Sequence, residues 1–550
     1  MRRTRCTLFL LLCSLALAAL AAPAASARQA ARGTPVAGGT LVYQLSSQPP
    51  GIDPLFAVPG IGGPSWIVAD ALFDGLTSWD AQSSTVVPAV ASSWSANTNA
   101  TVWTFNLRAD ATFSNGKAVA AQDFKFAWER LFKGASSKGW ASYMLSNVKG
   151  TNEFAAGKAK HISGVVAQNA TTLVVKLTTP DADFPSLVAC PNLAPVPAAL
   201  VSTPKKIAQF RNAPVGNGPF MLAKPWNHHS TISLVANPSY YGTRPYIAGI
   251  TFKVIAKPAT AYAQFQANTI DVANFPPASL ATAEAAYGTS TDGFTAEPTQ
   301  QVIVGPTAIV DYWVFNTKKA PLNNVLVRRA FSLALDRTQL STELGAAISA
   351  TAMPATDMLS PGVPGYVPGQ WAFATLDLTQ AETLLTQAGF PGGVGLPTIS
   401  CLYTGYKLGL VTEFKTDLAA IGVNVKLVKV SWLQLLDRIY SRNFTTSPMG
   451  WQDDHPDASN VIFDLFYGPW NNSGSFYNNP TVNAALLAAR GTLDYATRLA
   501  AYQSIDATVA ADVPVTPVDY RGRDVVCSAR LHDAVPSPMD LFDFTRVWIQ

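Results

Sequence analysis

Apolar and polar residues follow two distinct periods along most of the chain. The period-two alternation of half-buried strands is found in residues 101–107 and 423–430. Residues 40–45, 172–177, 232–235 and 250–255 are also expected to form strands. The 3.6-residue spacing of amphipathic helices is found in residues 121–131, 259–268, 325–335, 379–388 and 412–420. Residues 48–64 are rich in Pro and Gly and are expected to form loop. Strands and helices that alternate in this way, without a repeat of 20–50 residues, predict an α/β architecture with more than one domain.

The N-terminus has the three parts of a secretory signal peptide. A basic segment, Met1–Arg5, precedes an apolar run from Leu8 to Ala22, and Ala25-Ser26-Ala27 offers a small-residue cleavage site. The run is short for a transmembrane anchor, which needs about 20 residues. Lipidation at Cys13 is a further alternative. We therefore expect residues 1–27 to be removed, residues 28–38 to form a flexible tether, and the protein to be exported to the periplasm or the extracellular face of the cell envelope.

Charge and cysteine content restrict the possible partners. Removal of residues 1–27 leaves 523 residues (550 − 27), and the loss of Arg2, Arg3 and Arg5 lowers the formal charge from +4 to +1. No basic patch remains that would favour nucleic acid or an anionic membrane. The three cysteines left, Cys190, Cys401 and Cys527, allow at most one disulfide, and the sequence does not indicate which pair would form it.

Motifs of enzymes and of cofactor sites are missing. The sequence has no phosphate-binding loop, no H-E-x-x-H, no C-x-x-C, no G-x-S-x-G and no dinucleotide fingerprint. His228 and His229 are the only adjacent histidines, and they follow Pro225-Trp226-Asn227, which is typical of a turn. We therefore expect neither catalysis nor a cofactor or resident metal.

A series of short segments is similar to the extracytoplasmic solute-binding proteins of peptide-importing ABC transporters, the oligopeptide- and dipeptide-binding family. The segments occur in the family's order from residue 38 to the C-terminus. They are Gly38–Leu45 with Ile52-Asp53-Pro54, Leu72–Leu76, Pro88–Arg130, Pro214–Phe220, Asn237–Tyr241, Phe315–Thr317, Val327–Ala330, Leu335–Arg337, Leu384–Phe390 and Phe544–Arg546.

The resemblance implies a two-lobed fold of the periplasmic-binding-protein type, of the large class with an extra inserted domain and a ligand cleft between the lobes. Lobe one would comprise residues 39–72, 195–305 and 520–550, the inserted domain residues 73–194, and lobe two residues 306–519. It further implies a monomer that captures short peptides and delivers them to ABC permease subunits. Alternatives are a non-peptide solute such as a metal chelate, an opine or a sugar, and a receptor for peptide signals without transport.

The resemblance also implies a ligand site at Gly450-Trp451-Gln452-Asp453-Asp454. Family members carry a G-W-x-x-D segment whose aspartate accepts the ligand's α-ammonium, which here is Asp454, with Gly450 and Trp451 in place. Tyr143 aligns with a ligand-contacting tyrosine. A carboxylate suits an ammonium in a dry cleft because charge strengthens each hydrogen bond.

Three alternatives stay open for this site. The acidic segment Asp453–Asp457, with His455, could hold a divalent cation, or it could be a solvated loop. Trp451 and Tyr143 could be core residues. The sequence departs from the family where basic residues usually precede Gly-Trp: Ser447-Pro448-Met449 stands there, with Arg438 and Arg442 nearby.

Overall fold

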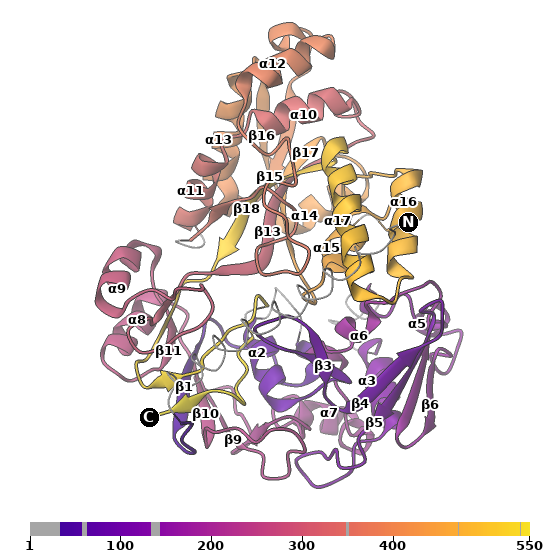
Figure 1. Ribbon diagram of the computed structural model, residues 1–550, viewed down its shortest axis with the longest axis vertical. Coiled ribbons are helices and arrows are strands. Elements are labelled where there is room, and N and C mark those ends of the chain that lie inside the picture. Colours follow the sequence, from indigo (N-terminus) through magenta and orange to yellow (C-terminus); the bar gives the residue numbers. More distant parts are fainter. Residues whose placement is uncertain (1–33, 58–62, 134–142, 348–350, 471, 540) are drawn as a thin grey trace, which may run out of the picture.

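The computed structural model describes residues 34–57, 63–133, 143–347, 351–470, 472–539 and 541–550. The expected signal peptide and the first part of the expected tether lie outside these residues. Three sheets of four to seven strands, with helices around them and two further two-stranded sheets, organise the described part of the chain, which confirms the predicted α/β fold class with two lobes (Figure 1). Among the described residues, no helix is long and apolar enough to cross a membrane.

Lobe one is built around a mixed seven-stranded sheet. Its strands, in spatial order, are β12 (Val302–Ile303), β19 (Val525–Cys527), β11 (Val272–Asn274), β1 (Thr40–Leu45), β10 (Gly249–Val254), β9 (Thr231–Ala236) and β8 (Phe220–Leu222). Leu41, Tyr43 and Leu45 of β1 alternate into the core, as the period-two pattern requires. Helices of this lobe are α2 (Gly63–Leu72), α7 (Pro204–Phe210), α8 (Pro258–Gln266) and α9 (Leu280–Tyr287).

A smaller antiparallel sheet follows in the region between α2 and lobe one's later strands. Its order is β4 (Ala91–Ala96), β5 (Val102–Leu107), β7 (Thr172–Lys176) and β6 (Val165–Asn169), beside the short pair β2 (Thr77–Trp79) and β3 (Val86–Pro88). Its helices are α3 (Ala121–Leu131), α5 (Thr151–Ala155) and α6 (Phe184–Leu187). Trp128 and Phe124 of α3 are fully buried, so one face of this helix closes the core. We call this part the inserted region.

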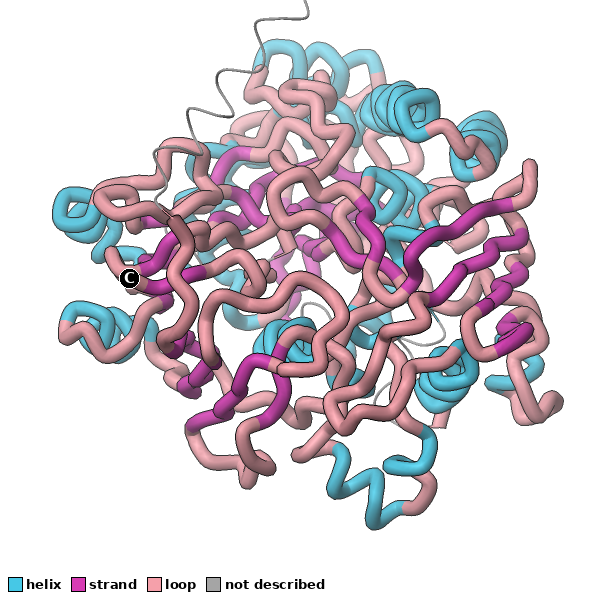
Figure 2. The backbone as a smooth tube through the Cα atoms, turned by 60° about the horizontal axis from the view of Figure 1, so that its bottom comes forward, coloured by secondary structure: helices cyan, strands magenta, loops and turns pink. Residues whose placement is uncertain are grey.

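Lobe two contains a six-stranded sheet covered on both faces. The order is β14 (Met353–Pro354), β18 (Val515–Gly522), β13 (Pro306–Phe315), β17 (Thr446–Gln452), β15 (Ile399–Tyr403) and β16 (Val425–Lys429). The helices are α10 (Val325–Leu333), α11 (Arg337–Ala347), α12 (Leu378–Gln387), α13 (Leu408–Ala419), α14 (Trp432–Tyr440), α15 (Ala458–Phe466), α16 (Pro480–Arg490) and α17 (Tyr495–Asp512). Seen from a second direction, helices lie mainly at the periphery of the molecule (Figure 2).

Strand β13 separates the two cores of lobe two. Trp313 stacks on Phe414 of α13 with ring centroids 4.0 Å apart, and Phe315 meets Phe331 of α10. Tyr312, which points to the opposite face, belongs to the core that contains Leu435 of α14 and Tyr502 of α17. The ten-residue strand is therefore almost entirely buried, because both of its faces are covered.

The chain passes between the two large sheets at two places close in space. The first crossing runs from β12, in the sheet of lobe one, to β13, which starts three residues later at Pro306 in the sheet of lobe two. The second crossing runs from β18 of lobe two, which ends at Gly522, to β19 of lobe one, which starts at Val525. Because β17 is antiparallel to β13, its carboxyl end at Gln452 points back to these crossings. The exact bounds of the two lobes and the inserted region stay a prediction.

One expectation about local structure is wrong. Residues 48–64 are not all loop: Pro54–Phe56 form a 3₁₀ turn and α2 begins at Gly63. Asp53 caps the turn by accepting the backbone N–H of Leu55 at 3.0 Å, and Pro54 has the φ that a first helical position needs. Cys190, Cys401 and Cys527 are buried free thiols, so no pair of them forms a disulfide.

Candidate ligand-binding site

Strand β17 presents an exposed backbone edge next to the crossings between the lobes. Asp453 donates its backbone N–H to Ala308, and the register pairs Trp451 with Val310, so odd-numbered residues of β17 bond to β13. The N–H and C=O of Gly450 and Gln452 therefore point to the other edge. There, β15 pairs with β17 only at Cys401 and Thr446 within the described chain, and Gly450 is exposed. This edge can accept another strand.

Gly450 is required by its neighbours on the sheet. A Cβ at this position would lie 2.9 Å from Oδ1 of Asp311 and 3.7 Å from Nη2 of Arg521. Asp311 cannot move aside easily, because Lys407 Nζ binds its Oδ1 at 3.2 Å and Arg521 Nε binds its Oδ2 at 2.7 Å. Although burial opposes the shift, these two cations hold the pKa of Asp311 below its usual value. Gly450 thus leaves room for the Asp311–Arg521 pair beside the strand.

Asp454 is a buried carboxyl group whose oxygens accept no hydrogen bond within the described part of the chain. The residue is 1 % exposed, and neither carboxylate oxygen accepts a hydrogen bond from the described part of the chain. Burial, followed by the negative charge of Asp464, raises the pKa of Asp454 well above its ordinary value, while the nearby Asn460 amide and Tyr143 hydroxyl oppose the shift. A cationic group that entered here would relieve the cost of burying this carboxylate.

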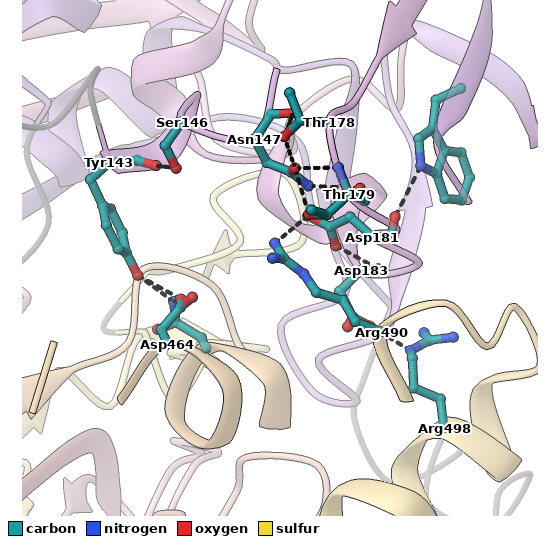
Figure 3. A network of polar contacts seen from close by, with 12 residues as sticks. Tyr143, Ser146, Asn147, Thr178, Thr179, Asp181, Asp183, Asp464, Arg490 and Arg498 are labelled. Atoms are coloured by element: carbon teal, nitrogen blue, oxygen red, sulfur yellow. Dashed lines mark hydrogen bonds and ion pairs between the residues drawn. The ribbon is translucent and has the colours of Figure 1, made fainter. Parts of the chain in front are cut away.

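Two aromatic side chains and helix α15 surround Asp454. The rings of Tyr143 and Trp451 meet edge to face, with centroids 6.3 Å apart. The hydroxyl of Tyr143 donates to Oδ2 of Asp464 at 2.6 Å (Figure 3). Both aromatics also contact the core, so each is half-buried and shared between the core and the site. Tyr143 comes from the inserted region and Trp451 from lobe two, which places the site between these parts.

Two site residues, Asn460 and Asp464, were missed at the sequence level. Asp457 starts α15 by accepting the backbone N–H of Ser459 at 2.9 Å, and positions 460 and 464 then share one helix face. The signal that could have revealed them is this N-cap followed by Asn and Asp four residues apart. The four predicted residues are Gly450, Trp451, Asp454 and Tyr143. Trp451, Asp454 and Tyr143 come together, and Gly450 precedes Trp451 on strand β17.

The acidic segment does not form a metal centre. Among the described residues, no three His, Cys, Asp or Glu side chains are grouped so that they could hold a metal ion. Asp457 is occupied as the N-cap of α15, and the backbone N–H of Asp454 is bound by Asn460. The alternative of a solvated acidic loop is wrong, because Asp453, Asp454, His455 and Asp457 are all buried.

A row of ion pairs joins the inserted region to lobe two beside the site. Arg490 of α16 binds Asp181, and Nε of Arg498 of α17 binds Oδ1 of Asp183 at 2.6 Å (Figure 3). The hydroxyl of Tyr502 donates to the same Asp183 at 3.0 Å. Burial, together with the charge of Asp457, raises the pKa of Asp183 to about 7. These contacts bring together segments more than 300 residues apart.

A cavity of about 480 Å³ lies between the lobes. Lobe one contributes Tyr43, Gln44 and Asn274, and lobe two contributes Thr307, Gln452 and Arg521. Gln452 is the last residue of β17, so the cavity reaches the exposed strand edge. Its volume lies within the range of small-molecule sites, which is about 300–1,000 Å³.

Comparisons with known proteins agree with this geometry. The model of the bacterial extracellular solute-binding proteins, family 5, middle region, matches residues 85–473. The periplasmic oligopeptide-binding protein OppA of Escherichia coli is 30% identical over 88% of this chain and 87% of its own length. The periplasmic murein peptide-binding protein MppA of E. coli is 27% identical over 87% of each chain. The unliganded open form of the murein tripeptide-binding protein MppA superposes with a TM-score of 0.77 at 24% identity, over 94% of this chain and 98% of that one.

Proposed function

Because the chain belongs to the bacterial extracellular solute-binding proteins of family 5, we propose that it captures short peptides outside the cytoplasm and delivers them to an ABC importer. The observation that carries the proposal is Asp454, a buried carboxyl group that no described residue pairs, at the end of an exposed strand edge. A peptide supplies both an ammonium for the carboxyl group and a backbone for the edge. The protein acts by binding, not by catalysis.

The α-ammonium of the peptide binds Asp454. Charge-assisted hydrogen bonds are strongest where water is excluded, and Asp454 is almost completely buried. Asn460 holds the backbone of Asp454 in place, and the rings of Tyr143 and Trp451 form the walls next to it. Ammonium binding also favours the ionised form of Asp454, because a nearby cation lowers the pKa that burial has raised.

The peptide backbone pairs with the edge of β17 at Gly450 and Gln452. Such strand addition gives affinity through main-chain hydrogen bonds, which are the same for every sequence. Specificity is then set by the two ends of the peptide and by side-chain pockets. The ligand lies between lobes joined by two crossings, so a hinge motion about residues 303–306 and 522–525 can enclose it. The enclosed form is the one that permease subunits receive.

The test is native mass spectrometry of the protein isolated from its exporting host, followed by identification of released ligands and calorimetry with tri-alanine. Short peptides are expected to be released from the wild type. Asp454→Asn should weaken tri-alanine binding by at least about 30-fold, equivalent to 2 kcal/mol or more, and N-acetyl-tri-alanine should bind poorly to both proteins. Asp437→Asn, on the exposed side of α14, is the matched control and should bind as the wild type does. A single non-peptide solute, retained equally by the wild type and by Asp454→Asn, would overturn the proposal.

A further inference from the structure

A second cavity, of about 570 Å³, lies outside the peptide site. It is lined by helix α2, the inserted region, the loop between β9 and β10, and the C-terminal segment 537–545. None of its described lining residues falls in the range 306–519 expected for lobe two. It shares a single lining residue, Phe542, with the interlobe cavity. The proposed function makes no use of this second cavity.

Three carboxyl groups line the second cavity. They belong to Asp70 on α2, Asp74 just after α2, and Asp543 near the C-terminus. Asp74 accepts hydrogen bonds on Oδ2 from the hydroxyls of Tyr240, at 2.9 Å, and Tyr241. Asp70 accepts no hydrogen bond and forms no ion pair within the described chain. The carboxyl group of Asp70 is therefore available to a ligand.

The cations of the cavity wall are already bound to other acids. Arg108 is the only basic residue in the described wall, and its Nε and Nη2 bind Asp110, outside the cavity, at 3.1 and 3.2 Å. A fourth acid of the wall, Asp80, pairs with Arg546 at 3.7 Å. Arg108 acts on Asp74 only through its charge. The three carboxyl groups thus leave the cavity with an excess of negative charge.

Burial and mutual repulsion make this arrangement of acids costly. Burial, followed by the charges of Asp74 and Asp543, raises the pKa of Asp70 well above its ordinary value. Burial also raises the pKa of Asp74 to about 6, although the two tyrosine hydroxyls oppose this shift. A cation close to these groups would favour their ionised forms and offset the repulsion. The cavity therefore suits a positively charged ligand.

Aromatic rings form much of the remaining wall and indicate an organic cation. The rings belong to Trp79, Tyr240, Tyr241, Phe542 and Phe544. Aromatic faces attract ammonium groups and also pack against alkyl chains. Among the described residues, no three acids are grouped closely enough to hold a metal ion. A ligand that reaches the separate carboxyl groups must therefore be extended, and the volume lies within the usual range of small-molecule sites.

We propose that this cavity, between lobe one and the inserted region, binds an aliphatic amine with at least two ammonium groups, one of them at Asp70. A second ammonium reaches Asp74 or Asp543, and the alkyl chain between the two lies against the aromatic rings. The inference goes beyond the proposed function and does not depend on it, because the peptide site and this cavity use different acids.

The experiment is isothermal titration of the full-length exported protein, freed of bound ligand, with putrescine, butylamine and butanediol. The wild type should bind putrescine, and butylamine at least about tenfold more weakly because it lacks the second ammonium. Butanediol, which has the same carbon chain without charge, should not bind measurably. Asp70→Asn should lower putrescine affinity by at least about tenfold. Glu153→Gln, exposed on α5 and outside the cavity wall, removes the same charge and should leave putrescine affinity unchanged.

Two further measurements place the diamine in this cavity rather than in the interlobe site. Asp454→Asn should retain putrescine binding and lose tri-alanine binding, whereas Asp70→Asn should show the reverse. Asp70→Asn should fold, because it removes a buried charge and no described hydrogen bond, and its retained tri-alanine binding reports this directly.

The outcomes separate this inference from the proposed function. Four results would overturn the diamine site and leave the peptide proposal intact: no putrescine binding by the wild type, unchanged affinity in Asp70→Asn, butanediol binding as tightly as putrescine, or loss of putrescine binding in Asp454→Asn. Failure of the wild type to bind tri-alanine while it binds putrescine would overturn the proposed function and leave the diamine site.

Discussion

The side-chain oxygen of Asn460 accepts the backbone N–H of Asp454 at 2.8 Å, which ties helix α15 to the residue at the centre of the site. The same oxygen lies 3.3 Å from Nε1 of Trp451, and the amide nitrogen donates to Asp464 at 2.9 Å. The side chain of Asn460 thus contacts the backbone of Asp454, the Trp451 ring and the Asp464 carboxylate at once. Asn460 positions the other residues without having to contact a ligand.

Replacing Asn460 by alanine should weaken ligand binding and stability together. The backbone N–H of Asp454 would be left buried without its acceptor, so the free energy of unfolding should fall by about 1–3 kcal/mol. Affinity for tri-alanine should fall by about tenfold, because Asp454 and Trp451 lose their fixed orientation. Calorimetry and urea unfolding measure the two effects. The control is Asn483→Ala on α16, which removes the acceptor of the backbone N–H of Gly468 and should leave binding unchanged.

Gly450→Ala should impair binding while the fold persists. The added Cβ would lie 2.9 Å from Oδ1 of Asp311, so Asp311 and its partner Arg521 must shift away from the strand edge. We expect an affinity loss of about tenfold for tri-alanine. The control is Gly345→Ala in α11, whose added Cβ would make an ordinary van der Waals contact with Ala352 at 3.6 Å. It should raise stability by about 0.5–1 kcal/mol and leave binding intact. Equal effects of the two substitutions on binding would contradict this account of Gly450.

Local patterns predict the elements of this fold better than they predict their assembly. The strand pattern at 423–430 corresponds to β16, and the helical pattern at 379–388 corresponds to α12, each within two residues. These elements bury one regular face, so the spacing of their apolar residues carries the signal. Helix α2 was missed because its sequence, GPSWIVADAL, is apolar almost throughout and follows a Pro- and Gly-rich stretch. Its environment, rather than its period, makes it a helix.

The site was predictable only where a short motif carried it. Gly450, Trp451 and Asp454 lie in one segment, so a family resemblance could identify them together. Asn460 and Asp464 depend on where α15 starts, and Arg521 depends on the pairing of β18 with β13. Such contacts join positions that are 210 residues apart in the case of Arg521 and Asp311, and no local pattern records them. The contact of Arg521 with Asp311 beside Gly450 therefore required the three-dimensional structure.

Arg498→Met should destabilise the protein far more than the loss of a surface ion pair would. Arg498 and Asp183 are both more than 90% buried, and removal of the arginine leaves a carboxylate inside the protein without its cation. We expect the free energy of unfolding to fall by about 3–5 kcal/mol. The double variant Arg498→Met, Asp183→Asn should recover part of the loss, because the unpaired charge is removed as well. Arg546→Met, which breaks an exposed pair with Asp80, should cost less than about 1 kcal/mol in the same urea titration.

Asp417 should make the protein less stable as the pH rises. Burial raises the pKa of Asp417 from 3.8 to about 7. The charges of Glu413 and Asp336 reinforce this shift, whereas the hydrogen bond from the backbone N–H of Asp336 and the charge of Arg337 oppose it. Between these two values the folded protein binds a proton that the unfolded chain has released. The contribution of this group to the free energy of unfolding therefore falls as the pH rises from about 4 to about 7.

Asp417→Asn removes that titration and keeps an oxygen that can accept the backbone N–H of Asp336. Relative to the wild type, the variant should become progressively more stable as the pH rises from about 4 to about 7, with no further change above about 8. Urea unfolding across this range measures the difference. Asp292→Asn is the control: hydrogen bonds from the backbone N–H groups of Thr295 and Phe294 hold the pKa of Asp292 below 3.8 against the effect of burial. Its difference from the wild type should stay constant from about pH 5 upward, where Asp292 is ionised in both the folded and the unfolded protein. A constant difference for Asp417→Asn would mean that this carboxyl group is ionised in the folded protein despite its burial.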